Sequence, residues 1–373
     1  RINSECFKSM TLLNQLFNEF GQSPWLDNLK REWLHSGDLQ DWIDKGVRGL
    51  TSNPSIFEKA ISQSDAYDQQ FKSLITSGMS IEDAYWQLVQ TDIADALRLL
   101  KPIHESSGGL DGYVSVEVDP RLARDTQATV NAARELDDEL NSKNLYIKIP
   151  GTSEGLPAIR QMISEGRSIN VTLLFSVERY AEVIEAYISG LEAYEGDLSH
   201  ISSVASFFIS RTETEVDKRL EQIGTPEALA LKGKTAISQG QIAYELFLEK
   251  FSGGRWKVLE DRGAQLQRPL WASTSTKNPD YPDTMYVDKL IGPNTVNTLP
   301  DGTLAAFLDH GTLERTIDTP FTEAHNVLAN VKAIGIDLGD VAKQLEVEGV
   351  ASFENSFENL LETLKQKADL LGK

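Results

Sequence analysis

The amino-acid sequence predicts an α/β protein built as a single (β/α)8 barrel with additional C-terminal helices. Eight short, apolar, β-prone runs follow one another along the 373 residues, and helical patterns separate them. Strands that alternate with helices favour parallel strands joined by crossovers, and eight such units favour a closed barrel. The competing arrangement is an open doubly wound sheet, which typically carries a glycine-rich dinucleotide turn after its first strand, and no such turn follows here.

The eight expected strands are recognised by their length and their apolar, β-prone composition. In order, they cover residues 24–27, 46–52, 112–118, 145–149, 168–175, 203–209, 268–274 and 295–299. We expect residues 1–23 to form an N-terminal extension and a lead-in helix. Residues 24–373 are then expected to form the barrel together with its helical tail.

Helical periodicity fills the intervals between the strands. Apolar residues from Ile81 to Leu100 recur every three to five positions, and Ser80 with Asp83 suits the N-terminal cap of that helix. Residues 180–191 repeat the pattern after the fifth strand. In the C-terminal tail one apolar stripe, expected to be core packing, consists of Phe353, Phe357, Leu360, Leu361 and Leu364.

Composition bounds the class of protein. The chain is 40% hydrophobic and 25% charged, which is typical of a soluble globular protein, and it has no apolar run long enough to span a membrane. Its start lacks the features of a secretory signal, and Met10 is interpreted as the native start. The single cysteine, Cys6, allows no disulfide framework, so we expect a reducing compartment, the cytoplasm.

The charge balance bounds the partners. The 36 lysines and arginines against 56 aspartates and glutamates give a net charge of -20. Such a surface repels nucleic acid, and any anionic metabolite must find a local cluster of cations. The five histidines lack the spacing of metal ligands, and we expect no metal.

Lys148 interrupts an apolar run, between Ile147 and Ile149 in the segment NLYIKIPG at 144–151. An ammonium group is costly to desolvate, and the cost is avoided by a carboxylate partner or by loss of the proton. Because an unprotonated lysine forms Schiff bases with carbonyl substrates, Lys148 is the first candidate nucleophile. The alternative is that one face of the strand is wet and that Lys148 is simply solvated.

Polar residues also interrupt strands that a parallel barrel buries on both faces: Glu117, Asn170, Thr172 and Ser206. The carboxyl ends of barrel strands are where this architecture places its chemistry. Asn53 is expected at the same rim, because Pro54 ends the second strand directly after it. For each residue taken alone, structural hydrogen bonding is the competing interpretation.

Five segments, in this order and with these gaps, resemble the transaldolase family of the pentose phosphate pathway: GLTSNPSIFEKAI, GYVSVEVDP, LYIKIPGTSEG, INVTLLFS and SFFISRTETEVDK. The resemblance runs from about Pro24 to the C-terminus and points to the longer-chain branch of the family. It implies a class I aldolase barrel that needs no metal or organic cofactor. It also implies transfer of a dihydroxyacetone unit from sedoheptulose 7-phosphate or fructose 6-phosphate to glyceraldehyde 3-phosphate or erythrose 4-phosphate.

The resemblance further implies roles for individual residues. Lys148 corresponds to the Schiff-base lysine of the family, and Asp27 to its general acid and base. Glu117 and Thr172 correspond to the residues that shuttle protons through a bound water. The substrate-binding residues of the family correspond to Asn53, Asn170 and Ser206 for the hydroxyl groups, Phe208 for the pocket wall and Arg211 for the phosphate.

The chain departs from the family pattern after the seventh strand. Many members carry a Ser-Phe-Arg run there, whose arginine is a second phosphate clamp, whereas this chain reads STSTKN at 273–278. We expect Lys277 to supply the charge, and Ser273 and Ser275 the hydroxyl donors. Because lysine lacks the two-pronged geometry of arginine, the competing interpretation is that Lys277 is a solvated surface lysine.

Two other functions stay open. A fructose 6-phosphate aldolase that releases free dihydroxyacetone would share the lysine, but Glu117 in the proton-relay position and the long chain disfavour it. A non-catalytic relative acting as a binding protein is disfavoured by the complete set of Asp27, Glu117 and Lys148. The expected partners are sugar phosphates, and the chain is expected to act as a monomer or homodimer.

Overall fold

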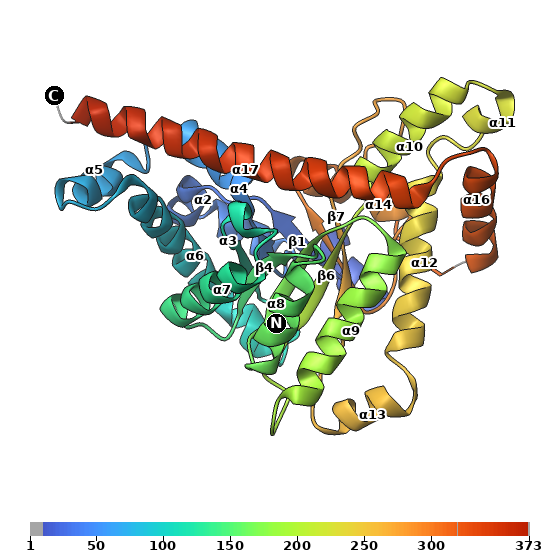
Figure 1. Ribbon diagram of the computed structural model, residues 1–373, viewed down its shortest axis with the longest axis horizontal. Helices are drawn as coiled ribbons and strands as arrows, with labels where there is room; N and C mark the ends of the chain where they lie inside the picture. Colours follow the sequence, from blue (N-terminus) through green and yellow to red (C-terminus); the bar gives the residue numbers. More distant parts are fainter. Residues whose placement is uncertain (1–9, 319, 372–373) are drawn as a thin grey trace, which may run out of the picture.

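A computed structural model of the chain describes residues 10–318 and 320–371. Eight parallel strands close into a barrel in sequential order, from β1 to β8 and back to β1, with helices between them (Figure 1). The predicted (β/α)8 barrel with C-terminal helices is therefore confirmed. Cys6 and the other residues before the expected start at Met10 lie outside the described residues, so the expectations that rest on them stay predictions.

All eight predicted strands are present. They are β1 (Gln22–Asp27), β2 (Leu50–Thr51), β3 (Val114–Glu117), β4 (Leu145–Pro150), β5 (Ile169–Leu174), β6 (Ser203–Phe208), β7 (Arg268–Ala272) and β8 (Thr295–Leu299). The predicted bounds of the second strand were wrong, since 46–52 shortens to two residues. Gly46 has a φ of 119°, a turn conformation that ends the extended backbone on that side, and Pro54 begins a helix on the other.

The helices occupy the intervals between the strands and the tail. They are α1 (Leu12–Phe20), α2 (Arg31–Ser36), α3 (Asp38–Asp44), α4 (Pro54–Ser62), α5 (Asp68–Thr76), α6 (Ile81–Ser106), the 3-10 helix η1 (Pro120–Leu122), α7 (Thr126–Leu140), α8 (Gly155–Ser164), α9 (Val177–Ala193), α10 (Ser210–Ile223), α11 (Pro226–Leu229), α12 (Thr235–Lys250), α13 (Gly253–Asp261), α14 (Met285–Asp288), α15 (Asp301–His310), α16 (Phe321–Ala333) and α17 (Leu338–Leu371). The predicted cap of α6 is confirmed, because the Ser80 hydroxyl accepts from the Asp83 amide at 3.1 Å. No helix among the described residues is long and apolar enough to cross a membrane.

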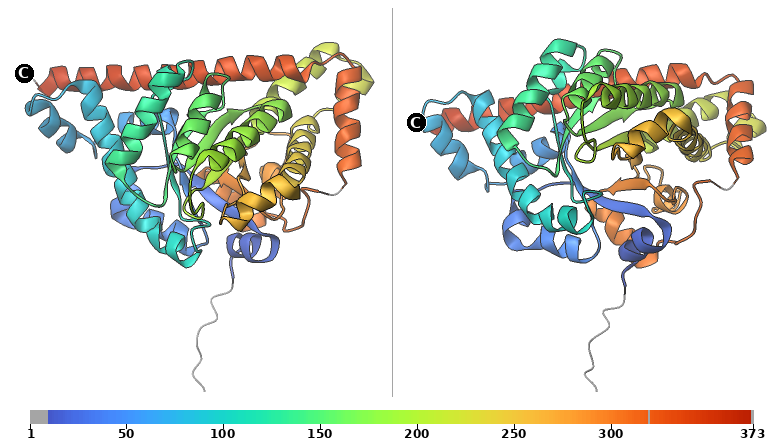
Figure 2. Two further views of the ribbon diagram at one scale, coloured as in Figure 1. Left: turned by 60° about the horizontal axis from the view of Figure 1, so that its bottom comes forward. Right: turned by 90° about the horizontal axis from the view of Figure 1, so that it is seen from below.

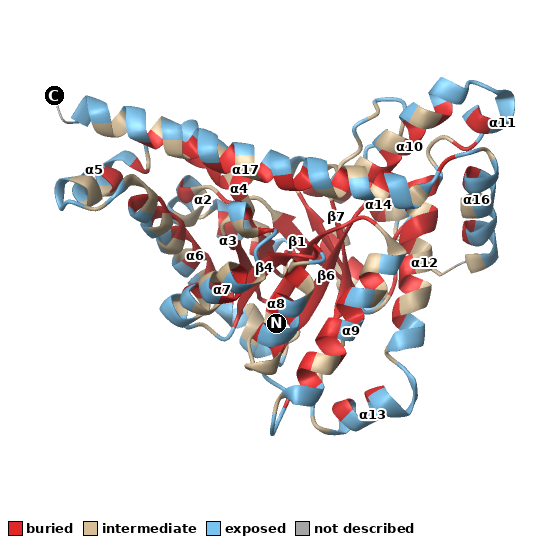
Figure 3. Cartoon of the chain, viewed as in Figure 1, coloured by how far each residue is buried: buried red, intermediate tan, exposed pale blue. Residues whose placement is uncertain are grey.

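The last helix, α17, lies across one end of the barrel, and α1 lies at the opposite end (Figures 1 and 2). Helix α17 packs on α4, α6 and α10. Because α4 and α10 follow β2 and β6 directly, the end of the barrel that α17 covers carries the carboxyl ends of the strands. The side of α17 that faces the barrel is buried and the opposite side is exposed (Figure 3). The predicted apolar stripe is confirmed: four of its residues are buried and Leu361 is partly buried.

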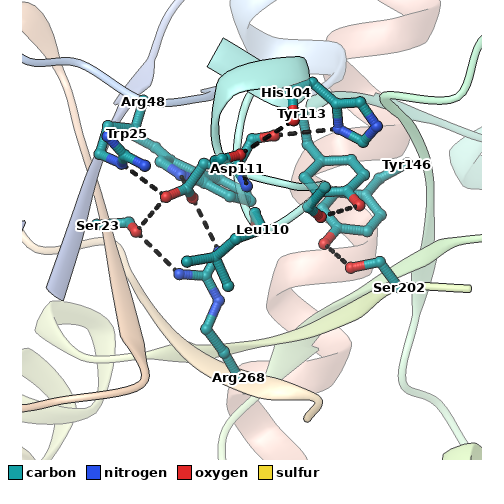
Figure 4. Close-up of polar contacts among 12 residues, drawn as sticks. Ser23, Trp25, Arg48, His104, Leu110, Asp111, Tyr113, Tyr146, Ser202 and Arg268 are labelled. Atoms are coloured by element: carbon teal, nitrogen blue, oxygen red, sulfur yellow. Dashed lines mark hydrogen bonds and ion pairs between the residues drawn. The ribbon is translucent and has the colours of Figure 1, made fainter. Parts of the chain in front are cut away.

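The buried carboxylate of Asp111 links several parts of the chain at the end of the barrel where the strands begin (Figure 4). It accepts hydrogen bonds from Ser23 and Arg48 at 2.7 Å, from Arg268 at 2.9 Å and from the Trp25 indole at 3.0 Å. Burial alone would raise the pKa of Asp111, but the two guanidinium groups outweigh it and hold the pKa below its ordinary value. This network joins the starts of β1 and β7 to the loops before β2 and β3.

Large side chains fill the barrel between this network and the opposite end. The Tyr113 and Tyr146 rings stack at 4.1 Å, and Trp25 lies 6.1 Å from Tyr146. Gly49 faces the Trp25 ring so closely that a Cβ there would come within 2.5 Å of it. This part of the interior is therefore a packed core rather than a pore.

Candidate active site

A cavity opens at the end of the barrel that α17 covers. Its lining includes nine of the twelve residues predicted for the site: Asp27, Asn53, Lys148, Ser206, Phe208, Arg211, Ser273, Ser275 and Lys277. The other three, Glu117, Asn170 and Thr172, are buried beside or below it. Residues from β1, β4, β6 and the loops after β2 and β7 thus meet in one place, as the carboxyl ends of parallel strands do.

Lys148 is buried, with 5% of its surface exposed, so the interpretation that it lies on a wet face is wrong. On β4 it is aligned with Glu117 on β3 and with Asn170 on β5. Its Nζ atom donates a hydrogen bond to the Ser52 carbonyl at 3.2 Å. A buried amine that opens on a cavity and is held by a neutral carbonyl is well suited to attack a carbonyl substrate.

Asp27 lies at the end of β1, where a chain of hydroxyl groups orients it. The Thr51 hydroxyl donates to its carboxylate at 2.8 Å and lies 2.6 Å from the Thr298 hydroxyl. Burial raises the pKa of Asp27 above its ordinary value, although the nearby charge of Lys148 opposes the shift. A carboxyl group with a raised pKa can take up and return a proton during a reaction.

Asn170, on β5, is fully buried and is fixed by side chains from β3 and β6. Its Nδ2 donates to the Ser115 hydroxyl at 3.0 Å, and its Oδ1 accepts from the Ser206 hydroxyl at 2.7 Å. Asn53 is fixed differently, because its Oδ1 caps α4 by accepting from the Ile56 amide at 2.9 Å. Asn53 also lines the cavity.

Glu117 and Thr172 are buried, and within the described part of the chain neither carboxylate oxygen nor the Thr172 hydroxyl has a hydrogen-bond partner. Burial raises the pKa of Glu117 to about 7, while the charges of Lys148 and Arg211 oppose the shift. Unsatisfied polar atoms are unusual in a protein interior and call for an explanation, of which a role in proton transfer is one.

The β5 backbone is irregular beside Thr172. The pairing with β6 shifts between Val171 and Leu174, and Leu173 has a φ of 61°. Ser273, which follows β7, has a φ of 54°. A left-handed conformation is costly for residues other than glycine and tends to occur at functional sites. Leu173 adjoins Thr172, and Ser273 is itself a residue predicted for the site.

The loop after β7 carries the residues at which the chain departs from the family pattern. The Ser273 hydroxyl lies 2.7 Å from that of Ser210, and the Ser275 hydroxyl lies 2.8 Å from that of Thr303. Lys277 is exposed but lines the cavity. The positive charge of Lys277 partly opposes the rise in the pKa of Asp27 that burial causes.

Basic side chains gather at the cavity although the chain carries a net charge of -20. Lys148, Arg211 and Lys277 line it together with the carboxylate of Asp27. Arg211 lies in the first turn of α10, with its Cζ 5.1 Å from the centre of the Phe208 ring. Such a cluster can attract an anionic substrate against the field of the whole molecule.

Six residues that line the cavity were not predicted for it: Thr51, Ala272, Thr274, Thr298, Pro300 and Phe353. Thr298 lies in the strand TVNTL, in which three of five residues are polar, so it does not stand out from an apolar run as Thr172 does. Thr51 belongs to the Thr-Ser-Asn-Pro motif but was not assigned a role. Phe353 carries no local signal, because its place in an apolar stripe indicates only packing. Within residues 10–318 and 320–371, no group of three or more potential ligands is arranged to hold a metal ion.

Comparison with known proteins assigns the chain to a family. A family model described as Transaldolase/Fructose-6-phosphate aldolase matches residues 24–364. A protein named Transaldolase from Frankia alni is 48% identical over 357 residues, covering 94% of this chain and 96% of the relative. Proteins of the same name from Thermobifida fusca (48% identity, 95% and 97% coverage) and Mycobacterium ulcerans (49%, 95% and 96%) match as fully. The chain belongs to the transaldolase/fructose-6-phosphate aldolase family.

Proposed function

We propose that this protein is a transaldolase that moves a dihydroxyacetone unit from a ketose phosphate to an aldose phosphate through a Schiff base on Lys148. The observation that carries the proposal is the buried amine of Lys148, which opens on a cavity shared with Asp27 and Arg211. Family membership over nearly the whole chain supports it.

The reaction begins with attack of the Lys148 amine on the ketose carbonyl carbon. Loss of water from the carbinolamine gives an iminium ion, which accepts the electron pair when the bond between C3 and C4 breaks. Asp27 takes the proton of the C4 hydroxyl, and an aldose leaves. The enamine that remains attacks the carbonyl of an acceptor aldose, and the same steps in reverse release the new ketose.

Glu117 and Thr172 are proposed to handle the water and protons of the dehydration and hydrolysis steps. Their side-chain oxygen atoms have no hydrogen-bond partner among the described residues. They can therefore accept hydrogen bonds from a water molecule. A carboxyl pKa of about 7 for Glu117 suits a group that must both donate and accept near neutral pH.

The bound dihydroxyacetone unit is proposed to be held by the amide of Asn53 and by the network of Asn170 and Ser206. Its hydroxyl groups can replace or extend the hydrogen bonds that these side chains already make. Arg211 is proposed to bind the substrate phosphate, with Lys277 as a weaker second contact. We place the activity in the pentose phosphate pathway and in the cytoplasm, whose reducing conditions suit a chain with a single cysteine.

Reduction with borohydride in the presence of fructose 6-phosphate tests the proposal. We expect the peptide that contains Lys148 to gain one dihydroxyacetone unit, as measured by mass spectrometry. Lys148→Arg should abolish both the adduct and sugar transfer, because a guanidinium stays protonated. An adduct on another peptide, or none, would refute the assignment.

The variant Asp27→Ala separates the two stages of the reaction. If Asp27 serves bond cleavage rather than imine formation, this variant should still yield the reducible adduct with fructose 6-phosphate while turnover falls by about a hundredfold or more. Loss of the adduct would move Asp27 to an earlier step. Release of free dihydroxyacetone by the unmodified protein at the rate of transfer would instead identify an aldolase, the other activity in the family name.

A further inference from the structure

Arg211 lies against two aromatic rings that come from distant parts of the chain. Its Cζ atom is 5.1 Å from the centre of the Phe208 ring and 5.8 Å from that of Phe353. Both distances are within the range of a cation–π interaction. Phe208 ends β6, whereas Phe353 belongs to α17, and all three residues line the cavity that contains Lys148.

The rings hold the guanidinium without using up its hydrogen-bond donors. Among the described residues, the carboxylates of Asp27, Glu117 and Glu348 act on Arg211 by Coulombic attraction and not through a hydrogen bond. An arginine stacked on aromatic faces keeps its N–H groups at the edge, where they can bind a phosphate in a two-pronged geometry. The orientation of the guanidinium therefore depends on the rings.

Helix α17 approaches Arg211 closely because it carries a glycine at this point. A Cβ atom on Gly349 would lie 3.4 Å from Nη1 of Arg211 and 3.1 Å from Cδ2 of Leu173. Gly349 is one helical turn before Phe353, so the backbone of this turn packs beside the guanidinium and places the ring over the cavity.

Contacts on both sides of Phe353 fix that part of α17. Before it, Glu346 forms ion pairs of 2.9 Å with both Arg124 and Arg179. After it, the Ser356 hydroxyl lies 2.8 Å from that of Ser55 in α4. The Phe353 ring is itself buried, with 3% of its surface exposed. The Phe353 ring is therefore buried in a part of α17 that contacts hold on both sides.

We infer that Phe353 is a positioning residue for phosphate recognition: the C-terminal helix supplies the ring that orients Arg211 toward the phosphate of the substrate. The inference rests on the proposed function, in which Arg211 binds that phosphate. Phe353 contributes through Arg211, and it determines the preference for phosphorylated over non-phosphorylated sugars rather than the chemistry at Lys148.

The inhibition constant of inorganic phosphate against fructose 6-phosphate tests this role. Phe353→Leu removes the ring but keeps an apolar side chain, and we expect it to raise both this constant and the KM for phosphorylated substrates by about two- to tenfold. Turnover at saturation, borohydride trapping of Lys148 and the KM for glyceraldehyde should stay close to their original values. Phe353→Tyr keeps the ring and should restore phosphate binding.

Two controls separate orientation of Arg211 from other effects. Phe357→Leu alters the next turn of the same helix, where the ring packs against Tyr85 at 5.1 Å, and should lower stability without changing the inhibition constant. In an Arg211→Ala background, Phe353→Leu should have no further effect on phosphate. If Phe353→Leu does not fold, Phe353→Met serves in the same comparison.

The outcomes distinguish this inference from the proposed function. An unchanged inhibition constant in Phe353→Leu, or an equal increase with and without Arg211, overturns the positioning role while the transaldolase proposal stands. If Arg211→Ala itself leaves phosphate binding unchanged, the proposed phosphate site is wrong and the role of Phe353 is overturned with it.

Discussion

Most polar side chains at the carboxyl ends of the strands are held by their neighbours. Asn170 is fixed between Ser115 and Ser206, and Asp27 is oriented by the Thr51 hydroxyl. Polar groups that are already oriented in this way need little further reorganisation when a substrate binds. Glu117 is different, because its carboxylate is buried without a hydrogen-bond partner among the described residues.

The pKa of Glu117, about 7, predicts a pH-dependent step. The carboxyl changes from mainly protonated to mainly ionised between about pH 6 and pH 8. Since dehydration of the carbinolamine needs a proton donor, we expect the rate of adduct formation to contain a component that falls as pH rises through about 7. Glu117→Gln should remove this component and slow adduct formation by about a hundredfold or more, as measured by rapid quench with borohydride.

The same group should affect stability with a defined sign. The folded-state pKa of Glu117 is raised, so its contribution is favourable below the unfolded pKa of about 4.3 and is lost as pH rises through about 7. Glu117→Gln should therefore raise the melting temperature more at pH 8 than at pH 5. Glu213 is a matched control, because burial raises its pKa to about 8 and it does not line the cavity. Glu213→Gln should raise the melting temperature at high pH and leave the pH profile of adduct formation unchanged. A changed pH profile in this control would refute the assignment of the kinetic component to Glu117.

At the scale of elements, the two ends of the barrel have different tasks. At one end, helix α17 closes over the strand termini and supplies Phe353 to the cavity. At the other, Asp111 joins four parts of the chain through buried hydrogen bonds and two ion pairs, with Arg48 at 2.7 Å and Arg268 at 2.9 Å. The Asp111 network is expected to serve stability, since the cavity that contains Lys148 lies at the first end.

Removal of the Asp111 carboxylate should therefore be costly. Asp111→Ala leaves the buried guanidinium of Arg268 without its carboxylate partner, and we expect the free energy of unfolding in urea to fall by about 3–5 kcal/mol. Glu105→Ala is the control, because the Lys101–Glu105 pair is exposed on both sides and should contribute no more than about 0.5 kcal/mol.

The pH dependence has the opposite sign to that of Glu117. Because the folded-state pKa of Asp111 is lowered, its stabilising contribution is present above the unfolded pKa of about 3.9 and is lost as pH falls below that value. The stability difference between the original protein and Asp111→Ala should accordingly shrink in acid. A difference that stays constant down to pH 3 would show that the carboxylate charge is not what stabilises this end.

At the scale of the whole molecule, a net charge of -20 surrounds a cavity that is lined by the cations of Arg211 and Lys277, the amine of Lys148 and the carboxylate of Asp27. The global field repels a sugar phosphate, whereas the local cations attract it. Salt distinguishes the long-range repulsion from the local attraction. The screening length falls from about 30 Å at 0.01 M to about 8 Å at 0.15 M ionic strength, and partly buried charges are screened less than exposed ones.

Raising sodium chloride across this range should improve the use of phosphorylated substrates. We expect kcat/KM for fructose 6-phosphate to rise by roughly two- to fivefold, because long-range repulsion is screened before the contacts within the cavity. Use of glyceraldehyde as the acceptor, measured with a saturating donor, should change little. A steady fall in kcat/KM over the whole range would mean that the local cations, and not the global charge, dominate the approach of the substrate.

The sequence by itself determined the number and order of the strands and the polar residues within them, while its resemblance to a family supplied the rest of the predicted cavity lining, such as Asp27 and Arg211. Alternation and apolar runs are local properties, and a polar residue such as Lys148 or Thr172 inside such a run is conspicuous whatever surrounds it. These signals also place such residues at the carboxyl ends of strands, because a parallel barrel brings all of those ends together.

Only the tertiary structure decided the remaining features. The shortening of β2 depends on the turn at Gly46 and on pairing with β1 and β3. The Asp111 network and the meeting of Phe353 with Arg211 each join residues from distant parts of the chain, so no local pattern identifies them. A buried charge and an aromatic side chain look the same in a sequence whether they stabilise the core or serve a site, because their partners are determined by how the chain closes in space.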